Sequence, residues 1–355
     1  MLEELSYNNS KIHFGDLQTV GFNEVLLNEY PDAKKIILTD ETVGSIWIEQ
    51  LVTSHSQLSK AEIIQIPEGE AFKTIDVCAQ IWEALSEYEI GRGDVIINFG
   101  GGVITDMGGF IASLYKRGLS FINIPTTLLS QVDASVGGKT GVDLGPFKNQ
   151  IGVFSDAAHV FIDDQFLKTL DEQQLKSGLA EMLKHGLISN ASHWIDLQNF
   201  VPSDPKGRLE LIRTSVKIKR DIVVQDHKEA GIRKILNLGH TIGHGIEGFL
   251  LEKETPTLHG YAVAWGMKAE SFIAYKQGLL SQKEYESIAA FIETYYPKCE
   301  IESKDFKAIL KLMYNDKKNM NGHIQFTFIS AIGKGIFNQG ATDVEILDAL
   351  NSLID

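Results

Sequence analysis

Cysteine is scarce in this 355-residue sequence: only Cys78 and Cys299 occur, far apart and without Cys-x-x-Cys spacing. This scarcity excludes a disulfide framework and a cysteine-based zinc site, and it indicates two reduced thiols. Long apolar runs are also missing, since no stretch approaches the roughly 20 residues that span a bilayer. The polar, acidic start lacks the pattern of a signal peptide. We therefore expect a cytoplasmic protein with no membrane partner.

Positive charge is in short supply as well. The sequence has 33 Lys and Arg against 47 Asp and Glu, a formal net charge of −14. This balance argues against nucleic acid or an anionic membrane as the main partner. It leaves room for a small anionic ligand, because a local cluster of Lys and Arg can override the global field. With 43% hydrophobic and 23% charged residues, the composition is that of an ordinary soluble globular protein.

The length favours two domains, and the apolar pattern changes near Asp171. Over residues 1–170, short β-branched runs alternate with helix-length segments, which predicts βαβ units and a largely parallel sheet. The expected strands lie within residues 34–41, 61–70, 93–102, 120–127 and 159–164, and a helix is expected over residues 75–90.

Over residues 171–355 the apolar residues recur with a period of 3.6, which predicts a mostly α-helical domain. The helical segments are expected at residues 171–188, 209–226, 239–251, 261–278 and 282–296. One short stretch, residues 322–340, is consistent with a late β-hairpin. The fold class we predict is therefore α/β, with a sheet domain followed by a mostly helical domain.

Three consecutive glycines, Gly100 to Gly102, follow a buried strand and open a helix. Glycine lets the backbone approach a ligand closely, and the free N–H groups of a helix start attract phosphate. The spacing to Asp106 is GGGxxxD, so the standard Rossmann fingerprint GxGxxG is absent. A tight turn without a ligand remains an alternative here.

A second glycine-rich stretch, residues 133–140, resembles a P-loop only superficially, because the first glycine of the GxxxxGK[ST] pattern is missing. ATP hydrolysis is therefore not expected. Lys139 follows two glycines, where an ammonium can meet a phosphate as a point charge. Lys148 and Asn149 come soon after. For any one of these lysines alone, a solvated surface charge is the simpler interpretation.

Candidate metal ligands occur in the second half. His240 and His244 are spaced i and i+4 and share a helix face, with glycines that we expect to keep this surface clear for a ligand. His259 follows, and Glu181 lies one helical turn before Lys184. Three protein ligands of the His2Glu type with one open position are typical of catalytic zinc. Spacing alone leaves open which two histidines would bind, and each one alone also fits a packing role.

These features together indicate one kind of chemistry. A phosphate cradle, a His/Glu metal site and several lysines favour a phosphorylated polyol as substrate. A metal ion that binds a hydroxyl lowers its pKa and favours the alkoxide that expels a hydride. A nicotinamide cofactor would accept that hydride.

Six stretches between about residues 60 and 330 share a common resemblance, and they read GGGVITDMGGFIASLYKRG, IPTTLLSQVDASVGGKTGVD, KNQIGVF, SGLAEMLKHGLI, EAGIRKILNLGHTIGHGIE and LHGYAVAWGM. Together, and in this order, they resemble the 3-dehydroquinate synthase family, which is part of the wider group of sugar-phosphate cyclases. The resemblance implies a Rossmann-like NAD-binding domain over residues 1–170. It also implies an α-helical metal- and substrate-binding domain over residues 171–355, and a homodimer.

The implied activity is that of a phosphorus–oxygen lyase of the shikimate pathway, which leads to the aromatic amino acids and chorismate. The substrate would be the anionic sugar phosphate 3-deoxy-D-arabino-heptulosonate 7-phosphate, and the products 3-dehydroquinate and phosphate. Transient oxidation by NAD, phosphate elimination, reduction, ring opening and an intramolecular aldol closure would follow one another at one site. The metal would be zinc or cobalt.

The resemblance also implies site residues. The implied metal ligands are Glu181, His240 and His259. The implied catalytic residues are Glu229, His244, Lys184 and Lys139. The implied substrate contacts are Arg117, Asp133, Lys139, Asn149, Lys184, Lys219, Arg233, Asn237 and one of Lys317 and Lys318. The implied NAD contacts are Glu68, Gly69, Glu70, Ala71, Phe72, Lys73, Gly102, Val103, Ile104, Thr105, Asp106, Thr126, Thr127, Lys139, Lys148, Phe166, Leu167, Lys168 and Thr169.

Three alternatives stay open at the level of the sequence. A metal-dependent polyol dehydrogenase would share the glycine loop and the metal residues, but it would accumulate NADH. A sister cyclase would make a different carbocycle and retain several of the same cations. A nucleotide- or metal-binding regulator fits less well, because an open coordination position favours catalysis and no DNA-reading motif is visible.

Overall fold

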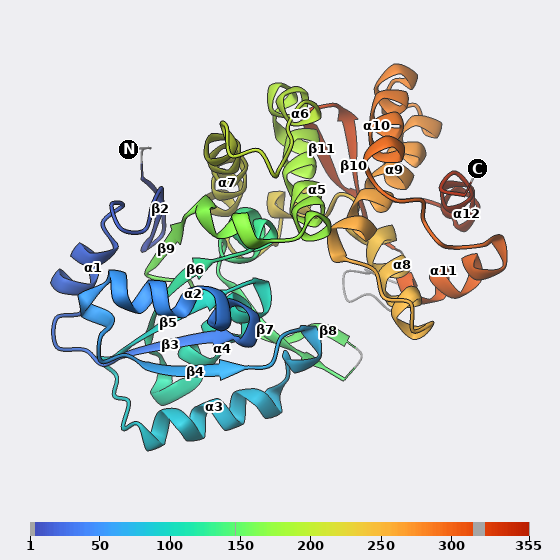
Figure 1. The fold of residues 1–355 in the computed structure, drawn as a ribbon. Coiled ribbons are helices and arrows are strands. Elements are labelled where there is room, and N and C mark those ends of the chain that lie inside the picture. The colour runs from blue at the N-terminus through green and yellow to red at the C-terminus, as the bar shows by residue number, and fades with distance from the viewer. Residues whose placement is uncertain (1–3, 146, 315–323, 355) are drawn as a thin grey trace. The chain divides into compact units, whose positions relative to one another are not determined.

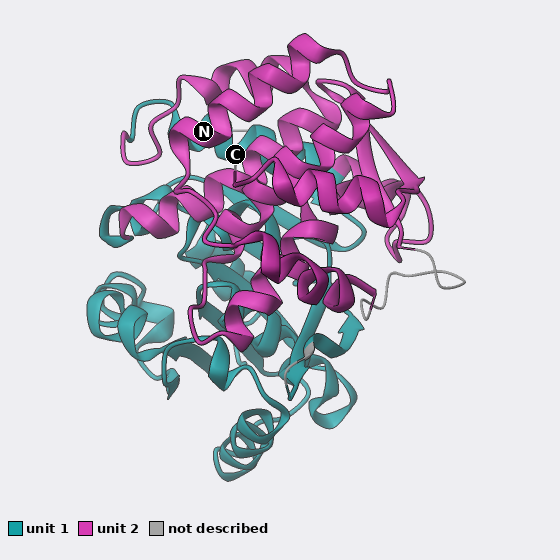
Figure 2. Cartoon of the chain, turned by 90° about the vertical axis from the view of Figure 1, so that its right-hand side faces the viewer, with its two compact units in different colours: residues 1–170, 205–220 teal, residues 171–204, 221–355 magenta. Residues whose placement is uncertain are grey.

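The computed structural model describes residues 4–145, 147–314 and 324–354. The chain (Figure 1) forms two compact units, which Figure 2 distinguishes by colour. The first unit consists of residues 1–170 together with residues 205–220, and the second of residues 171–204 and 221–355. The segment 205–220 thus packs with the sheet, although it follows residue 171 in sequence.

A seven-stranded sheet in the order β1-β2-β9-β6-β5-β3-β4 forms the centre of the first unit. Its strands are β1 (Leu5–Tyr7), β2 (Ser10–Phe14), β3 (Lys35–Asp40), β4 (Glu62–Ile66), β5 (Val95–Gly100), β6 (Ser120–Pro125) and β9 (His159–Ile162). Only β1 runs antiparallel, against β2, and all the other neighbours are parallel. Every residue of the internal strand β5 is buried, as is typical of a parallel sheet covered on both faces.

The helices of the first unit are α1 (Phe22–Asn28), α2 (Glu41–Ser54), α3 (Ile75–Glu87), α4 (Gly102–Leu114) and the first part of α7 (Arg208–Gln225). Helix α4 packs on β5 and β6, and α2 packs on β3 and β4. The Asp40 carboxylate caps α2 by accepting a hydrogen bond from Val43 N. Helix α4 lies close to β5, because a Cβ at Gly108 would come within 1.9 Å of Asn98 Oδ1.

An antiparallel hairpin, β7 (Lys139–Leu144) and β8 (Phe147–Phe154), stands apart from the main sheet. No strands were predicted for this glycine-rich stretch. Its glycines serve close pairing instead: a Cβ at Gly141 would lie 2.5 Å from the Ile151 carbonyl oxygen. Strand propensity scales penalise glycine and therefore miss such a hairpin.

The second unit is mostly helical. Its elements are α5 (Glu172–Ser189), α6 (Ala191–Gln198), α8 (His240–Glu252), α9 (His259–Lys276), α10 (Gln282–Tyr295), α11 (Phe306–Tyr314), α12 (Asp343–Asn351) and the hairpin β10 (Phe326–Ala331) with β11 (Lys334–Gln339). The last two strands form the expected late hairpin. Helix α9 is buried along most of its length and packs against α5, α8 and α10, so it is the central helix of this unit.

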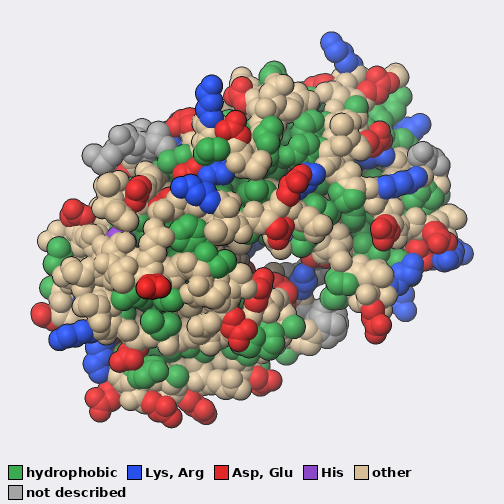
Figure 3. Space-filling model, in the orientation of Figure 1, with side chains coloured by type: hydrophobic (Ala, Val, Ile, Leu, Met, Phe, Trp, Pro, Cys, Tyr) green, Lys and Arg blue, Asp and Glu red, His purple; other side chains and the backbone are tan. Residues whose placement is uncertain are grey.

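The predicted fold class is confirmed: a Rossmann-like α/β part with a parallel sheet is followed by a mostly helical part. Among the residues that the structure describes, no helix has both the length and the apolar character needed to cross a membrane. On the face drawn in Figure 3, Lys and Arg side chains are interspersed with Asp and Glu side chains.

Candidate active site

Most of the residues predicted to contact NAD gather at one edge of the sheet in the first unit. Strands β4, β5, β6 and β9 are parallel, and the candidate residues follow their carboxyl ends (Figure 1). They lie at residues 68–73 after β4, 102–106 after β5, 126–127 after β6 and 166–169 after β9. Open parallel sheets bind their ligands at this edge. The start of α4 with its glycines stands there as well.

Lys73 is the centre of a polar network at this edge. Its buried ammonium donates to Asp106 Oδ2 at 2.7 Å and to Asn149 Oδ1 at 2.8 Å, and it lies 3.9 Å from Glu70 Oε1. Burial lowers the pKa of Lys73, but the carboxylates of Asp106 and Glu70 raise it by more, so the ammonium stays charged. The network ties the residues after β4 to the start of α4 and to the β7–β8 hairpin.

Other predicted NAD contacts are held by packing or by neighbours. Phe166 and Leu167 are buried, and Phe166 belongs to the main core, so a ligand would meet these two residues at the backbone. Thr169 Oγ1 accepts a hydrogen bond from Trp47 Nε1 at 3.0 Å. Thr127 Oγ1 pairs with Ser130 Oγ at 2.9 Å. Glu68 accepts from the Thr42 hydroxyl.

The predicted substrate contacts of the first unit do not all lie together. Lys219 Nζ donates to the carbonyl and the carboxylate of Asp133, both at 2.5 Å. Lys139 is exposed on the β7–β8 hairpin, as is Lys148, which was predicted to contact NAD. Arg117 follows α4 and precedes β6, so it lies at the amino edge of the sheet, opposite the other candidates. The structure therefore does not bring Arg117 to the others within this unit.

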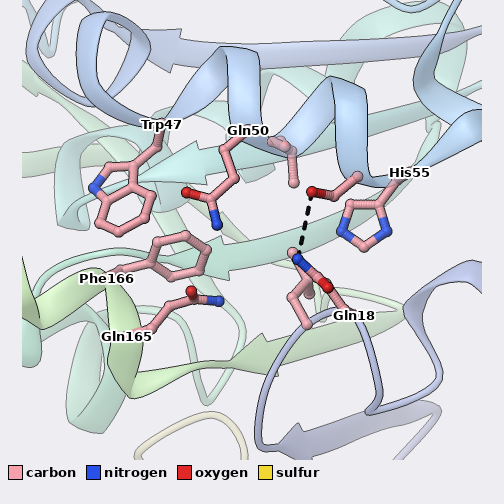
Figure 4. A pocket seen from close by; sticks show the side chains of 9 residues that line it. Gln18, Trp47, Gln50, His55, Gln165 and Phe166 are labelled. Carbon is pink, nitrogen blue, oxygen red and sulfur yellow. Dashed lines mark hydrogen bonds between the residues drawn. The ribbon is translucent and has the colours of Figure 1, made fainter.

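A crevice between α2 and the segment after β9 has little room for a ligand (Figure 4). Its volume is about 20 Å³, close to that of one water. Trp47 and Phe166 form one side of it, and Gln18 Nε2 donates to Ser54 Oγ at 3.4 Å near His55. It is a packing gap beside the core rather than a cofactor site.

The predicted metal ligands of the second unit converge. Glu181 Oε1 lies 3.5 Å from His240 Nε2 and 3.6 Å from His259 Nε2. Ligand atoms about 2.0–2.2 Å from a tetrahedral zinc lie roughly 3.3–3.6 Å apart, so these separations fit one bound ion. His244 stands in the same cluster, since one ring nitrogen from each of His240, His244 and His259 falls within 4.8 Å of the others. The three histidines thus form one cluster, and Glu181 lies beside two of them.

Charge around this cluster is balanced by buried partners. Glu181 is fully buried, and its Oε2 accepts a hydrogen bond from the buried ammonium of Lys184, one turn later on α5. Burial lowers the pKa of His259, whereas the carboxylates of Glu181 and Glu247 raise it, to about 10 in all. Without a metal ion this imidazole is therefore protonated at neutral pH, and a cation that binds to it must displace a proton.

Glycines bring the helices of the cluster together. A Cβ at Gly260 would come within 2.0 Å of the Ser177 carbonyl oxygen, which places the start of α9 directly on α5. A Cβ at Gly243 would come within 2.7 Å of the Ala262 carbonyl oxygen. Gly243 therefore serves helix packing, and our expectation that it keeps the surface clear for a ligand is wrong.

A loop before α8 brings together further candidates. Asn237 Nδ2 donates to Glu229 Oε1 at 2.7 Å, and the Arg233 guanidinium donates to the His227 carbonyl oxygen. Asp226 organises this loop by accepting from the backbone N–H groups of residues 230, 231 and 233. Glu229 has a left-handed backbone, with φ of 60°. Asn149 (φ 52°) and Arg117 (φ 68°) share this conformation, which costs non-glycine residues energy and concentrates at functional sites.

Comparison with known proteins decides the family. The N-terminal model of 3-dehydroquinate synthase matches residues 63–177, and the C-terminal model matches residues 178–319. The chain is 42% identical over 303 residues to the 3-dehydroquinate synthase of Parabacteroides distasonis. The aligned region covers 85% of this chain and 86% of that protein. It is 42% identical over 305 residues to the one of a Sulfurovum species, with 85% of each chain covered.

The chain belongs to the 3-dehydroquinate synthase family. It is therefore an enzyme. The structure is similar to that of a 2-epi-5-epi-valiolone synthase from Streptomyces hygroscopicus, solved with NAD+ and Zn2+ bound, with a TM-score of 0.85, 27% identity and coverage of 100% of this chain and 98% of that one. A 2-deoxy-scyllo-inosose synthase shares the fold, with a TM-score of 0.84, 21% identity and coverage of 98% and 99%.

Burial separates the cations of this 3-dehydroquinate synthase family member into two groups. Among the described residues, the buried Lys and Arg side chains are Lys35, Lys73, Lys184, Arg208, Lys219, Arg233 and Lys268. Four of these seven, Lys73, Lys184, Lys219 and Arg233, are predicted site residues. Charged side chains are rarely buried without a partner. The burial of these four cations therefore points to a specific role, which the sequence alone does not reveal. Lys317 and Lys318, one of which was predicted to contact phosphate, lie outside the described residues.

Two buried carboxylates beside the histidines were not predicted from the sequence. Glu247 Oε2 lies 3.4 Å from His259 Nδ1. Glu270 accepts from Gly239 N at 2.6 Å and from Ile242 N at 3.0 Å, and so caps the start of α8. Glu247 could have been found from the sequence, because it follows His240 and His244 at i+7 and i+3 on one helix face. Glu270 could not, since its partners are backbone groups of another helix.

Proposed function

We propose that this chain is a 3-dehydroquinate synthase, a phosphorus–oxygen lyase that converts 3-deoxy-D-arabino-heptulosonate 7-phosphate to 3-dehydroquinate and phosphate. The observation that carries this proposal is the convergence of Glu181, His240 and His259 in a member of this family. The reaction has no net redox change, since the substrate is oxidised and later reduced at the same site. We also propose that the protein acts in the cytoplasm, as a homodimer.

Two cofactors belong to this proposal. Residues 1–170 would bind NAD through the segments after β4, β5, β6 and β9, with Lys139 and Lys148 nearby. Residues 171–355 would hold zinc or cobalt through Glu181, His240 and His259, whose donor atoms fit the spacing of a bound ion. When bound, the metal and the nicotinamide supply a Lewis acid and a hydride acceptor for the transient oxidation.

The substrate is anionic, carrying a carboxylate and a phosphate, and the buried cations suit it. We assign substrate contacts to Lys184, Lys219 and Arg233, because a cation held by burial keeps its position and pairs strongly with an oxyanion. The remaining assigned contacts are Asp133, Lys139, Asn149, Asn237 and one of Lys317 and Lys318. Arg117 is assigned as well, although within its own unit it lies at the opposite edge of the sheet. The net charge of −14 does not exclude an anionic substrate, because a few local cations can override the global field at a binding site.

Proton transfers in the reaction need groups with exchangeable protons near the ring. We assign this role to His244 and Glu229, with Lys184 and Lys139 as further catalytic residues. His244 stands in the histidine cluster, and the Glu229 carboxylate is oriented by the amide of Asn237. A carboxylate fixed by a hydrogen bond loses little entropy when it accepts a proton from the substrate.

The test is a phosphate assay on the purified, metal-loaded protein. With NAD+ and 3-deoxy-D-arabino-heptulosonate 7-phosphate, phosphate should be released while the absorbance at about 340 nm stays flat, since NAD is regenerated in each turnover. The product should have the mass of 3-dehydroquinate. No phosphate release at all would contradict the proposal.

Two other outcomes support different functions. Stoichiometric NADH without phosphate release would indicate a metal-dependent polyol dehydrogenase. Phosphate release from another sugar phosphate, with a different carbocyclic product, would indicate a sister cyclase, which the structural similarity to a 2-epi-5-epi-valiolone synthase keeps as the second candidate. The two relatives at 42% identity favour the quinate product.

A further inference from the structure

Glu247 is a buried carboxylate in contact with one of the proposed metal ligands. It lies on α8 and is only 6% exposed, and its Oε2 is 3.4 Å from Nδ1 of His259, the first residue of α9. Burying an ionised carboxylate is costly unless it is paired. The pairing with an imidazole offsets part of that cost and links the two helices at the metal cluster.

The two proposed histidine ligands are oriented in the same way. Each presents Nε2 to Glu181 Oε1, at 3.5 Å for His240 and 3.6 Å for His259. Each presents Nδ1 to an acceptor behind it, which is the Leu238 carbonyl oxygen at 3.1 Å for His240 and Glu247 for His259. An acceptor at Nδ1 keeps the proton on that nitrogen and leaves the lone pair of Nε2 for a cation.

We propose that Glu247 is a positioning residue, which holds the Nδ1–H of His259 so that Nε2 faces the metal ion. The inference rests on the proposed function, because it takes His259 as a ligand. A carboxylate is a stronger acceptor than a carbonyl oxygen, and it raises the basicity of the ligating nitrogen.

The position of His259 explains why it needs the stronger partner. Its side chain is 28% exposed, against 11% for His240, so packing restrains it less. His259 is also the first residue of its helix and follows an extended residue, so no preceding turn of α9 packs against it. His240 follows Leu238 closely in sequence, so a local carbonyl oxygen is enough to orient it.

The experiment compares metal binding by the full-length protein and its Glu247 variants. Metal-free protein is titrated with Co2+ against a chromophoric chelator, and the visible absorption of the bound Co2+ is recorded. Glu247→Gln should lower the affinity about tenfold and Glu247→Ala up to about 100-fold, in the range that such outer partners contribute. The Co2+ spectrum should change as well, since the imidazole donates less strongly and is less fixed.

Glu252→Gln is the matched control, because it removes one carboxylate from the exposed end of the same helix. It should leave both affinity and spectrum unchanged. Glu247→Asp keeps the charge but moves it away from Nδ1 of His259. This variant replaces the neutral ones if they do not fold, and its affinity for Co2+ should also fall.

The outcomes distinguish a failure of the role proposed for Glu247 from a failure of the proposed metal site. If the wild type binds Co2+ and the folded Glu247 variants bind it within about threefold, with the same spectrum, the role of Glu247 is refuted while the metal site stands. If the wild type binds neither Co2+ nor Zn2+, the metal part of the proposed function falls, and this inference falls with it.

Discussion

Two imidazoles share a hydrogen bond between strands β2 and β9 of the first unit. His13 Nε2 lies 3.0 Å from His159 Nδ1, and His159 Nε2 lies 3.0 Å from Glu29 Oε2. The other nitrogen of His13 is 3.4 Å from Glu4. Burial, and to a lesser extent the neighbouring His159, lower the pKa of His13 to about 4. A neutral His13 is therefore part of the folded state.

This has a predictable effect on stability. The pKa of His13 in the unfolded chain is about 6.5, so between pH 6.5 and pH 4 the unfolded state binds a proton that the folded state does not. The free energy of unfolding should therefore decrease as the pH falls through this window. Urea unfolding at several pH values between about 7 and 5 measures the slope, and His13→Asn should make it shallower.

The slope should not vanish in that variant, because His193 in the second unit has a pKa lowered by burial to about 4 as well. Combining His13→Asn with a substitution of His193 should flatten it further. An unchanged slope in the His13 variant would show that the titration of this imidazole does not affect stability.

At the scale of elements, the candidate metal cluster depends on how closely three helices approach one another. A Cβ at Gly266 on α9 would come within 1.9 Å of the Gly239 carbonyl oxygen, next to His240. Gly239 itself has a left-handed backbone, with φ of 79°, which allows the chain to turn into α8. These glycines are thus part of the geometry that holds the histidines.

Gly266→Ala should separate α8 from α9, because the obstacle is backbone and cannot rotate away. We expect a loss of about 3 kcal/mol in the free energy of unfolding and weaker Co2+ binding. Gly248→Ala is the control on α8, since its Cβ would meet only Leu312 Cδ1 at 3.8 Å, an ordinary contact. It should be neutral or stabilise by about 0.5–1 kcal/mol. Thermal unfolding of both variants makes the comparison, and equal stabilities would count against the close-packing argument.

The elements also show what periodicity can and cannot predict. The parallel strands β3, β5, β6 and β9 were predicted because buried strands of a parallel sheet are continuously apolar. The β7–β8 hairpin was missed because its glycines indicate a loop. The hairpin of β1 and β2 was missed because its short strands carry polar residues such as Ser10 and Lys11. Pairing partners, rather than local pattern, determine these strands.

At the scale of the whole chain, motifs predicted the parts of the site but not all of its geometry. Glu181, His240 and His259 are about 60 and 20 residues apart in sequence and are brought together by glycine-mediated helix contacts that no spacing reveals. From their spacing, His240 and His244 were equally good candidates for a metal ligand, and both lie in the histidine cluster of the structure. Arg117 lies at the sheet edge opposite the other candidates, a fact of topology that a linear motif does not contain.

Metal binding should be visible in the stability of the molecule. A ligand that binds only the folded state stabilises it by RT ln(1 + [L]/Kd), about 2.7 kcal/mol at 100 times Kd. For a unit the size of the second one, this corresponds to a rise in melting temperature of roughly 5–10 °C. Zn2+ added to chelator-treated protein should therefore raise the melting temperature by about this amount.

The specificity of that rise tests the donor set. Mg2+ prefers six oxygen ligands in an octahedron, whereas the cluster offers two imidazole nitrogens and one carboxylate, so Mg2+ should give no shift. His240→Ala removes one of the three donors and should abolish most of the Zn2+ shift while leaving the metal-free protein folded. A Zn2+ shift of wild-type size in His240→Ala would place the ion elsewhere in the chain. An equal response to Mg2+ would indicate a carboxylate site instead of the histidine cluster.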